Sequence, residues 1–257
     1  MDTNINPQIS IIIITKNRAG FISKAVESVQ KQGFSNWELL ILDDDSNDGS
    51  RSIIEAFMAK DRRIKYHKNS PALGISKNRN FGLCLSLGKY IAVLDSDDEW
   101  IDNDKLKKQF DFLENNPDYC LIGSNIKIVD EKNNLIKNTD VKIEDADIRK
   151  KILISNQIAH SSVLYKKESA EQIGGYDNKL SCVEDFDLFL KLGLLGKMKN
   201  LEEITTSYTR HSQGISKKRK LAMAWNHFVI VLKNFGKYPD WFLAIIFSQL
   251  RIIKNLF

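Results

Sequence analysis

Four acidic residues stand within five positions directly after a short apolar segment. The segment Tyr90–Leu94 reads Tyr-Ile-Ala-Val-Leu, and Asp95, Asp97, Asp98 and Glu99 follow it. Carboxylates crowded in this way repel one another unless a cation lies among them. Mg²⁺ and Mn²⁺ bind carboxylate oxygens and commonly keep diphosphate oxygens as further ligands. The pattern therefore predicts a divalent-metal site, with an acidic loop or the first turn of a helix as the alternative.

A second acidic cluster opens a segment with helical periodicity. Glu184, Asp185 and Asp187 stand at the start of a helix that we predict over Asp185–Leu195. The N-terminus of a helix favours an ionised carboxylate, which is the form that accepts a proton. The cluster therefore predicts either a general base or a set of carboxylates that cap the helix.

Alternating strands and helices position these clusters. Ile9–Thr15 is a run rich in β-branched residues, which is typical of a strand covered on both faces in a parallel sheet. We predict further strands over Trp37–Leu42, Arg63–His67 and Tyr90–Leu94, and helices over Phe21–Gln32, Ser50–Lys60 and Ser76–Leu87. This order predicts an α/β layer, in which ligands gather at the carboxyl ends of the strands.

The rest of the chain has weaker patterns. We predict a helix over Lys105–Asn115, strands over Cys120–Asp130 and Ser161–Tyr165, and a turn at Gly174-Gly175. From Lys217 onward, the spacing of the apolar residues predicts helices with a break near Pro239.

The composition indicates a folded protein of a reducing compartment. Apolar residues make up 42% of the 257 residues, which excludes a wholly disordered chain. The three cysteines form no C-x-x-C pair, so neither a disulfide framework nor a structural zinc site is expected. Met1–Gln8 lacks the apolar core of a signal peptide, and the apolar run Trp241–Phe247 is shorter than the ~20 residues that span a bilayer. We therefore expect a cytoplasmic protein.

The charge is divided unevenly along the chain. Residues 210–257 contain nine Lys or Arg and one acidic residue, whereas the first 209 residues carry a net charge of −3. This basic tail is also rich in aromatic residues. It predicts either a helical hairpin that packs on the main domain or on a second subunit as a homodimer, or an element that lies on an anionic membrane. The net acidic body, without an RNA-binding motif, argues against a nucleic acid partner.

Five segments follow one another in an order found in one known family. They read Ser-Ile-Ile-Ile-Ile-Thr-Lys-Asn-Arg (10–18), Trp-Glu-Leu-Leu-Ile-Leu-Asp-Asp-Asp-Ser (37–46), Gly-Ile-Ser-Lys-Asn-Arg-Asn-Phe-Gly (74–82), Gly-Lys-Tyr-Ile-Ala-Val-Leu-Asp-Ser-Asp-Asp-Glu-Trp (88–100) and Val-Glu-Asp-Phe-Asp-Leu (183–188). This combination resembles the family 2 glycosyltransferases of GT-A fold over about residues 8–211. The resemblance implies an α/β, Rossmann-like and mostly parallel sheet flanked by helices, in a catalytic domain over 1–214 followed by a helical extension over 215–257. Within the domain it implies a nucleotide-binding half over about 8–105 and an acceptor-binding half over about 106–214.

The resemblance also implies an inverting transfer of a sugar from a nucleoside diphosphate sugar, with Mn²⁺ or Mg²⁺ as cofactor. It places Thr15, Asn17, Asp44, Arg79 and Asp95 at the nucleotide, Asp95, Asp97 and His211 at the metal ion, Asp185 as the catalytic base, and Glu184, Trp100 and Asp98 at the acceptor or the sugar. Taken alone, several of these residues have ordinary structural explanations. Asp44 suits a cap for the helix from Ser50, Arg79 a surface ion pair, Trp100 a packed core, and His211 a surface or core histidine.

The resemblance further implies a UDP-sugar donor with a hexose or an N-acetylhexosamine, and a saccharide acceptor linked to a lipid diphosphate. Such an enzyme serves bacterial polysaccharide, O-antigen or capsule assembly at the inner face of the cytoplasmic membrane. Lys16 stands where many members of the family carry an aromatic residue, which leaves stacking on uracil open. A catalytically inactive nucleotide-binding module of the same fold is one alternative. A nucleotidyltransferase is another, which the absence of a Gly-rich phosphate loop after Thr15 disfavours.

Overall fold

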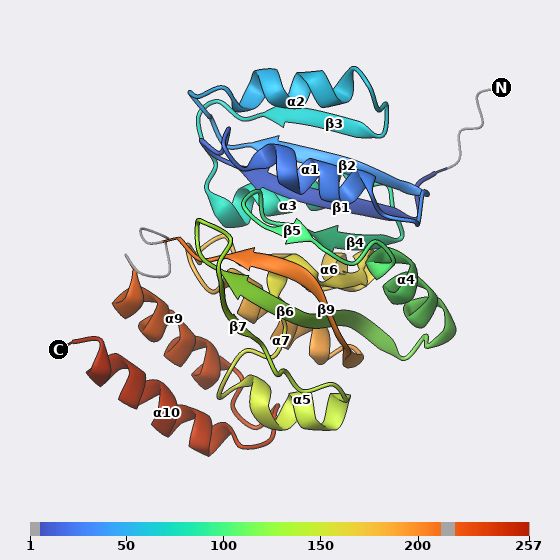
Figure 1. Ribbon diagram of the computed structural model, residues 1–257. Helices are drawn as coiled ribbons and strands as arrows, with labels where there is room; N and C mark the ends of the chain where they lie inside the picture. The colour runs from blue at the N-terminus through green and yellow to red at the C-terminus, as the bar shows by residue number, and fades with distance from the viewer. Residues whose placement is uncertain (1–5, 212–218, 257) are drawn as a thin grey trace.

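Figure 1 shows the computed structural model, which describes residues 6–211 and 219–256. Its first half alternates strands and helices as predicted, and each bound lies within two residues of the expected one. The elements are β1 (Ile9–Thr15), α1 (Ile22–Gln30), β2 (Trp37–Asp43), α2 (Ser50–Met58), β3 (Ile64–Lys68), α3 (Ile75–Leu85) and β4 (Tyr90–Val93). The chain thus builds a Rossmann-like layer before it reaches the acidic cluster.

The second half differs more from the expectation. It contains β5 (Glu99–Trp100), α4 (Lys105–Asn115), β6 (Tyr119–Val129), β7 (Leu135–Asn138), α5 (Asp145–Ile152), the 3₁₀ turn η1 (His160–Ser162), β8 (Leu164–Lys166), α6 (Lys167–Gln172), α7 (Glu184–Gly193), β9 (Lys197–Thr209), α9 (Lys220–Lys233) and α10 (Trp241–Lys254). The sequence analysis missed β5, β7, α5, α6 and β9. The segment Ser161–Tyr165, predicted as a strand, is a 3₁₀ turn followed by the short strand β8. Lys217, where the helical tail was predicted to begin, lies outside the described residues.

The nine strands of the described chain join one sheet, in the order β3-β2-β1-β4-β8-β6-β9-β5, with β7 beside β6. The pairs from β3 to β4 are parallel, whereas β8 runs antiparallel to both β4 and β6. The sheet is therefore parallel across its first four strands, as expected for the nucleotide-binding half, and mixed beyond them, where β9 runs parallel to β6 and antiparallel to β5. Thr15 pairs with Asp43 at the last position of β1 and β2, so the loops after both strands leave the same edge.

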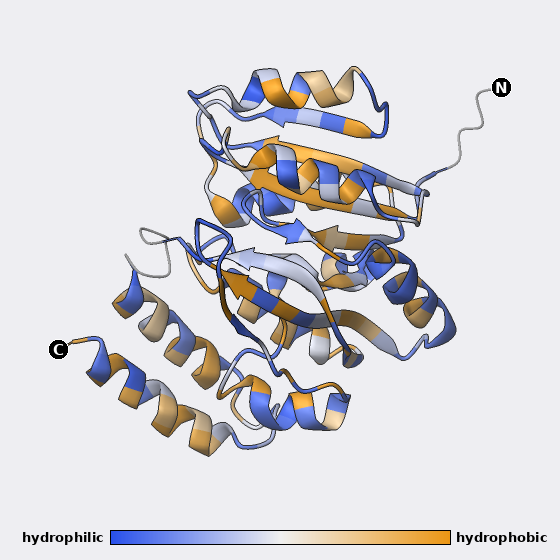
Figure 2. Ribbon diagram, in the orientation of Figure 1, coloured by the Kyte–Doolittle hydropathy of each residue, from blue (hydrophilic) through white to orange (hydrophobic). Residues whose placement is uncertain are grey.

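Two hydrophobic cores cover the opposite faces of the sheet. Ile9, Ile11 and Ile13 face the core shared with α1, α2 and α4, whereas Ile12 faces the core shared with α3, α5 and α7. All four side chains are buried. Burial on both faces explains why β1 carries isoleucine at consecutive positions, and Figure 2 shows β1 and β2 as strongly apolar strands.

The C-terminal hairpin, residues 219–256, consists of α9 and α10, which lie side by side and pack on α7 (Figure 1). Tyr238, between the two helices, donates a 2.7 Å hydrogen bond to the carbonyl oxygen of Leu190 in α7. His227 of α9 stacks on Phe186 of α7, with ring centroids 4.8 Å apart. One face of the hairpin therefore completes the core, and its helices break near Pro239 as predicted.

Candidate functional site

The loops after β1 and β2 are tied together at the sheet edge where Thr15 and Asn17 were expected. The backbone N–H of Asn17 donates to Ser46 Oγ (2.8 Å), and the N–H of Asn47 donates to Asn17 Oδ1 (2.8 Å). Ser46 in turn donates its own N–H to Asp43 Oδ1 (2.7 Å). Thr15 is buried, and its hydroxyl oxygen has no hydrogen-bond partner among the described residues. An unsatisfied hydroxyl therefore stands at the edge where a ligand is expected.

Asp44 anchors the segment that leads into α3. Its carboxylate accepts hydrogen bonds from the backbone N–H groups of Leu73 (2.6 Å) and Gly74 (3.1 Å). The alternative role as a cap for α2 is excluded, because Asp48 takes it and accepts from the N–H of Ser50 (3.0 Å). A carboxylate oxygen accepts two hydrogen bonds, so Asp44 Oδ2 keeps capacity for a donor group of a ligand.

Arg79 joins three segments of the site. It projects from α3, and its guanidinium donates to Asp95 Oδ1 (3.0 Å) after β4 and to Glu184 Oε1 at the start of α7. Its side chain is only 7% exposed, which excludes the alternative of a surface ion pair. A buried arginine with two carboxylate partners fixes these segments relative to one another.

The charges of this cluster shift one another's pKa. Burial raises the pKa of Glu184; Arg79 opposes the rise and Asp185 adds to it. Burial also opposes the ionised form of Asp95, but Arg79 and His160 outweigh it and hold the pKa of this carboxyl well below its usual range. Burial likewise works against the charge of Arg79, yet Glu184 and Asp95 keep its pKa above the ordinary value. Each charge therefore depends on its partners, and removal of one leaves the others with the full penalty of burial.

Asp97 and His211 lie together although they are far apart in the sequence. His211 Nε2 lies 2.9 Å from Asp97 Oδ2, and Arg18 Nε lies 3.4 Å from the same oxygen. Burial and the neighbouring Asp95 raise the pKa of Asp97. His211 Nε2 is buried and makes no hydrogen bond within the described part of the chain. The pair therefore offers one oxygen and one nitrogen to a further atom.

A divalent cation fits this pair. Adjacent ligand atoms of an octahedral ion stand about 3.0 Å apart when each bond is about 2.1 Å. The 2.9 Å between Asp97 Oδ2 and His211 Nε2 agrees with that spacing. Within residues 6–211 and 219–256, no group of three or more His, Cys, Asp or Glu side chains is arranged to hold a metal ion. A cation bound here would therefore take its remaining ligands from a bound phosphate group and water, as Mg²⁺ commonly does.

Asp185 lies in the first turn of α7 with its carboxylate uncommitted. It is half-buried, and no hydrogen bond or ion pair joins its side chain to the described residues. Val183, two residues earlier, has a left-handed backbone with φ of 57°. This conformation is rare for a β-branched residue and costs on the order of 1–3 kcal/mol. The surrounding structure therefore imposes the path of the chain into α7 and fixes Asp185 beside Glu184.

The structure buries three residues that were expected at the acceptor or the sugar. Trp100 and Asp98 are each 2% exposed, and Glu184 is committed to the buried ion pair described above. The indole N–H of Trp100 donates to the carbonyl oxygen of Ser161 (2.7 Å). Asp98 accepts from Ser161 Oγ and from the N–H of Thr209 (2.9 Å). Trp100 and Asp98 join η1 to β5 and β9, and Glu184 joins α7 to α3, so we propose that these side chains position the site.

Sequence reasoning gave no role to His160, which the structure places in the cluster. Its Nε2 lies 2.9 Å from Tyr176 Oη, and its Nδ1 lies 3.8 Å from Asp95 Oδ1. Nδ1 is buried and has no hydrogen-bond partner in the described residues. No local pattern marks His160, because its neighbours come from distant parts of the chain. Arg18 was also missed, and its place in the polar loop after β1 was the available signal.

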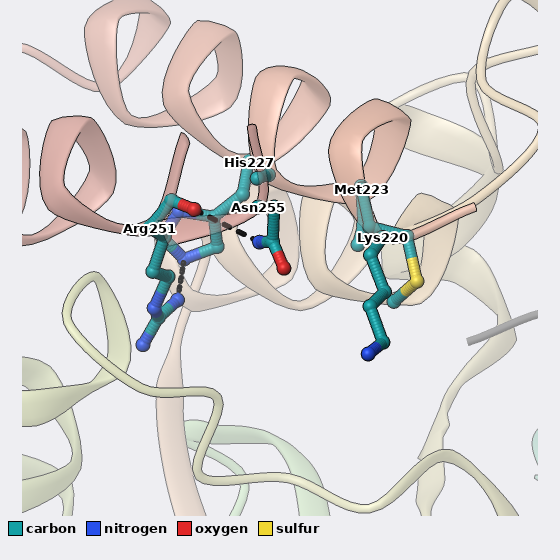
Figure 3. A pocket seen from close by; sticks show the side chains of 7 residues that line it. Lys220, Met223, His227, Arg251 and Asn255 are labelled. Atoms are coloured by element: carbon teal, nitrogen blue, oxygen red, sulfur yellow. Dashed lines mark hydrogen bonds between the residues drawn. The ribbon is translucent and has the colours of Figure 1, made fainter. Parts of the chain in front are cut away.

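A cavity of about 230 Å³ lies between the C-terminal hairpin and the residue that precedes α7 (Figure 3). It is lined by Val183, Lys220, Met223, Ala224, His227, Arg251 and Asn255. Figure 3 shows the side chains of Lys220 and Arg251 extending in the same direction from the two helices. Arg251 Nη1 lies 3.2 Å from His227 Nε2. The cavity thus has a mostly apolar lining with two cationic side chains.

The sequence profile described as Glycosyl transferase family 2 matches residues 10–174. The chain belongs to this family. An uncharacterized glycosyltransferase of Haemophilus influenzae is 31% identical over 90% of this chain and 88% of its own length. An uncharacterized glycosyltransferase of Methanocaldococcus jannaschii is 30% identical over 72% of this chain, which spans 64% of that relative. WfgD of Escherichia coli, described as a UDP-Glc:alpha-D-GlcNAc-diphosphoundecaprenol beta-1,3-glucosyltransferase, is 44% identical over 41% of this chain and 40% of its own length.

Solved structures show the same fold. TarS 1–349 of S. aureus has a TM-score of 0.70 at 19% identity, over 96% of this chain and 72% of that chain. The mannosyltransferase PcManGT of Pyrobaculum calidifontis, solved with GDP-Man and Mn²⁺, has a TM-score of 0.71 at 14% identity, over 98% of this chain and 76% of that chain. The fold of the family 2 chain is therefore GT-A, as the sequence resemblance implied.

Proposed function

We propose that this protein transfers a sugar from a nucleoside diphosphate sugar to a saccharide hydroxyl, with inversion at the anomeric carbon. The observation that supports this best is the uncommitted carboxylate of Asp185 in the first turn of α7. It stands next to Glu184, which Arg79 joins to Asp95, the first carboxylate of the acidic cluster after β4. A proton acceptor and this acidic cluster thus lie in one connected group, as a displacement at a diphosphate sugar requires.

We propose Mn²⁺ or Mg²⁺ as the cofactor, with Asp97 and His211 as its protein ligands. When bound, the cation would supply positive charge to the departing diphosphate. Arg79 uses one N–H of each terminal nitrogen on Glu184 and Asp95, so its guanidinium keeps further N–H groups for the diphosphate, among them the Nε–H that has no partner in the described residues. Thr15, Asn17, Asp44 and Asp95, at the carboxyl ends of β1, β2 and β4, form the proposed nucleotide site together with Arg79.

Asp185 is the proposed base. It takes the proton of the acceptor hydroxyl as the hydroxyl oxygen bonds to the anomeric carbon and the bond from that carbon to the diphosphate breaks. The N-terminal end of α7 favours the ionised carboxylate that this step needs. Inversion follows because the hydroxyl attacks from the face opposite the departing diphosphate.

The proposed donor is a UDP-sugar with a hexose or an N-acetylhexosamine, and the proposed acceptor is a saccharide on a lipid diphosphate. The name of WfgD states both kinds of substrate for that protein. TarS has been solved with UDP and with UDP-GlcNAc. TuaG of Bacillus subtilis is described as a putative teichuronic acid biosynthesis glycosyltransferase. These names support a role in bacterial polysaccharide assembly, and the proposed setting is O-antigen or capsule assembly at the inner face of the cytoplasmic membrane.

The decisive experiment is a thermal-shift titration with UDP, GDP, CMP and dTDP, each with and without Mn²⁺. A ligand at 100 times its Kd stabilises the folded state by about 2.7 kcal/mol, which raises the Tm of a chain of this size by roughly 5–10 °C. We expect this shift with UDP and Mn²⁺ together. Asp97→Asn should lose the Mn²⁺-dependent part, whereas Asp140→Asn, a change at an exposed carboxylate, should keep it.

Each outcome separates the proposal from its alternatives. A larger shift with GDP or dTDP would overturn the choice of uridine and keep the enzyme class. A Mn²⁺-dependent shift that survives Asp97→Asn would remove this residue as a ligand. Nucleotide binding without transfer to any saccharide would favour an inactive module. Release of pyrophosphate from UTP and a sugar 1-phosphate would indicate a nucleotidyltransferase.

A further inference from the structure

The outward face of α10 carries a series of large apolar side chains. The fully buried residues of α10 are the small Ala244 and Ser248. Its residues that are at least 40% exposed include the large apolar Phe242, Leu243, Ile246, Phe247, Leu250 and Ile253. A surface helix in water turns its polar residues outward. The outer face of α10 is apolar instead, so it is suited to contact with another molecule or a membrane.

Apolar exposure is concentrated on the C-terminal hairpin as a whole. Eighteen large apolar side chains are exposed in the described chain, and eleven of them lie in the hairpin. Besides those of α10, the hairpin exposes Leu221, Trp225, Leu232, Phe235 and Leu256. Figure 2 shows apolar residues along both helices. Patches of this extent mark a protein or membrane interaction site.

The same hairpin is strongly cationic. It carries Arg219, Lys220, Lys233, Lys237, Arg251 and Lys254, against the single acidic residue Asp240. Large apolar side chains mixed with Lys and Arg are typical of helices that lie in the interface of an anionic bilayer. Two copies of the chain joined through this face would bring like charges together, which opposes self-association. Charge therefore favours an anionic lipid surface over a second copy.

We infer that the outer face of the C-terminal hairpin is the surface by which this protein binds an anionic phospholipid bilayer. In the described part of the chain, no helix is both long and apolar enough to cross a membrane. Two helices of 14 residues, each about 21 Å long at 1.5 Å per residue, lie along the surface instead. Binding of the bilayer is inferred from the hairpin itself. Only the link to a lipid-linked acceptor rests on the proposed function.

The inner face of the hairpin joins this surface to the proposed base. His227 stacks on Phe186, the residue that follows Asp185. Ser248 Oγ donates to a carbonyl oxygen, so it accepts from His227 Nδ1 (3.0 Å) and leaves His227 Nε2 to accept from Arg251 (3.2 Å). This hydrogen-bonded chain joins α9 to α10, and the stacking of His227 on Phe186 joins α9 to α7. The helix that carries Asp185 is therefore rigidly attached to the bilayer-binding surface.

The cavity in Figure 3 opens where the hairpin meets Val183, two residues before Asp185. Its lining includes the cationic side chains of Lys220 and Arg251. A phosphate group at this end of the hairpin therefore meets positive charge close to the proposed base. A membrane-borne acceptor with a diphosphate near its sugar has the chemistry that this arrangement suits.

The test is co-sedimentation of the full chain with vesicles of equal parts phosphatidylglycerol and phosphatidylcholine, compared with phosphatidylcholine alone. We expect binding to the anionic vesicles that weakens as salt is raised. Lys237→Gln with Lys254→Gln should lower the partition coefficient about 30-fold, at about 1 kcal/mol for each lysine. Lys60→Gln, at an exposed lysine outside the hairpin, should leave it unchanged.

The apolar contribution is tested in the same assay. Phe242→Ser with Leu250→Ser should lower partition at least about tenfold, because both side chains insert into the interface. They are 63% and 53% exposed, so the variant should fold, which an unchanged melting temperature would show. Leu135→Ser, at a residue 61% exposed on β7, is the matched control.

Two results would overturn the inference. One is that the wild-type protein does not sediment with anionic vesicles, or that all four variants bind these vesicles as well as the wild type does. The other is a dimer in sedimentation equilibrium that Phe242→Ser with Leu250→Ser dissociates, together with no vesicle binding, which would make a second copy the occupant. The UDP thermal shift is measured on the same samples, so a failure of docking is distinguished from a failure of the proposed function.

Discussion

Replacing Arg79 with methionine should destabilise the protein strongly, because it leaves two carboxylates of the cluster without their partner. Removing one member of a buried ion pair costs about 3–5 kcal/mol. Asp95 is 29% exposed and regains some hydration in the variant, so most of the lost stability comes from Glu184. We therefore expect a loss at the lower end of this range. A loss of about 3 kcal/mol lowers the Tm of a chain of this size by roughly 6–12 °C.

The loss should depend on pH with a defined sign. In Arg79→Met, burial raises the pKa of Glu184 with no arginine to oppose it. The folded state then binds the proton more tightly than the unfolded state, so the variant loses stability as the pH rises above the unfolded pKa of about 4.3. The difference in Tm between wild type and variant should therefore widen as the pH rises above about 5.

Scanning fluorimetry across this pH range measures the effect. Arg79→Met combined with Glu184→Gln should recover part of the lost Tm at the upper pH, because the buried charge is gone. Arg51→Met is the matched control, since Arg51 forms an exposed ion pair with Glu55, and we expect no resolvable change. Equal melting temperatures for the single and double variants at every pH would refute the idea that Arg79 holds Glu184.

Three further changes test other parts of the structure. Asp185→Asn should lower transfer about 10²–10⁴-fold while the UDP shift persists, and near-normal turnover would remove Asp185 as the base. Burial, with Arg251, lowers the pKa of His227 from 6.5 to about 4, so the folded protein should lose up to about 3 kcal/mol as the pH falls across that interval. In urea titrations at several pH values, the free energy of unfolding of His227→Gln should lack this pH dependence. The same slope of that free energy against pH in the variant and the wild type would contradict the role of His227. Tyr238→Phe should lower the Tm by roughly 2–4 °C through loss of about 1 kcal/mol from its bond to Leu190, and an unaltered Tm would show that this bond adds nothing.

The first half of the fold was predictable because its signals are local. β1 is buried on both faces, and its consecutive isoleucines indicate this from the sequence of the strand alone. The helices between the strands keep one apolar face each, which gives the 3.6-residue period. Bounds within two residues follow from these two patterns.

The second half was harder because polar residues are buried there by long-range contacts. β9 was missed, and Thr205 inside it is buried by a 2.6 Å contact of its hydroxyl with Ser124 Oγ of β6. Asn200 is likewise buried, and its side-chain amide donates to the carbonyl oxygens of Lys142 (2.7 Å) and Gln157 (2.9 Å). The pattern of apolar and polar residues predicts a surface loop for such a segment. The segment forms a strand only because it pairs with neighbouring strands of the sheet.

The candidate site shows the same division. The sequence indicated carboxylates after β4 and at the start of α7, and in the structure Asp95 lies beside Asp97 and is joined through Arg79 to Glu184, the neighbour of Asp185. It did not indicate which members are buried, so Asp98 and Glu184 were expected to face substrate. Their burial is set by Ser161, Thr209 and Arg79, which lie from 63 to 111 positions away from their carboxylate partners. Residue type is thus readable from sequence, whereas exposure depends on tertiary contacts.

α7 is the element that connects the two proposals. Asp185 stands in its first turn, and α9 packs against the next residue, Phe186. If the hairpin rests on a bilayer, the base is held at a fixed height above the lipid surface, while the proposed metal ligands Asp97 and His211 are held where the chain leaves β4 and β9. A lipid-linked acceptor is confined to the membrane plane, so only its position within that plane has to be found by diffusion. Holding the base relative to that plane removes orientational freedom from the encounter, and this lowers the entropic part of the barrier before any chemistry begins.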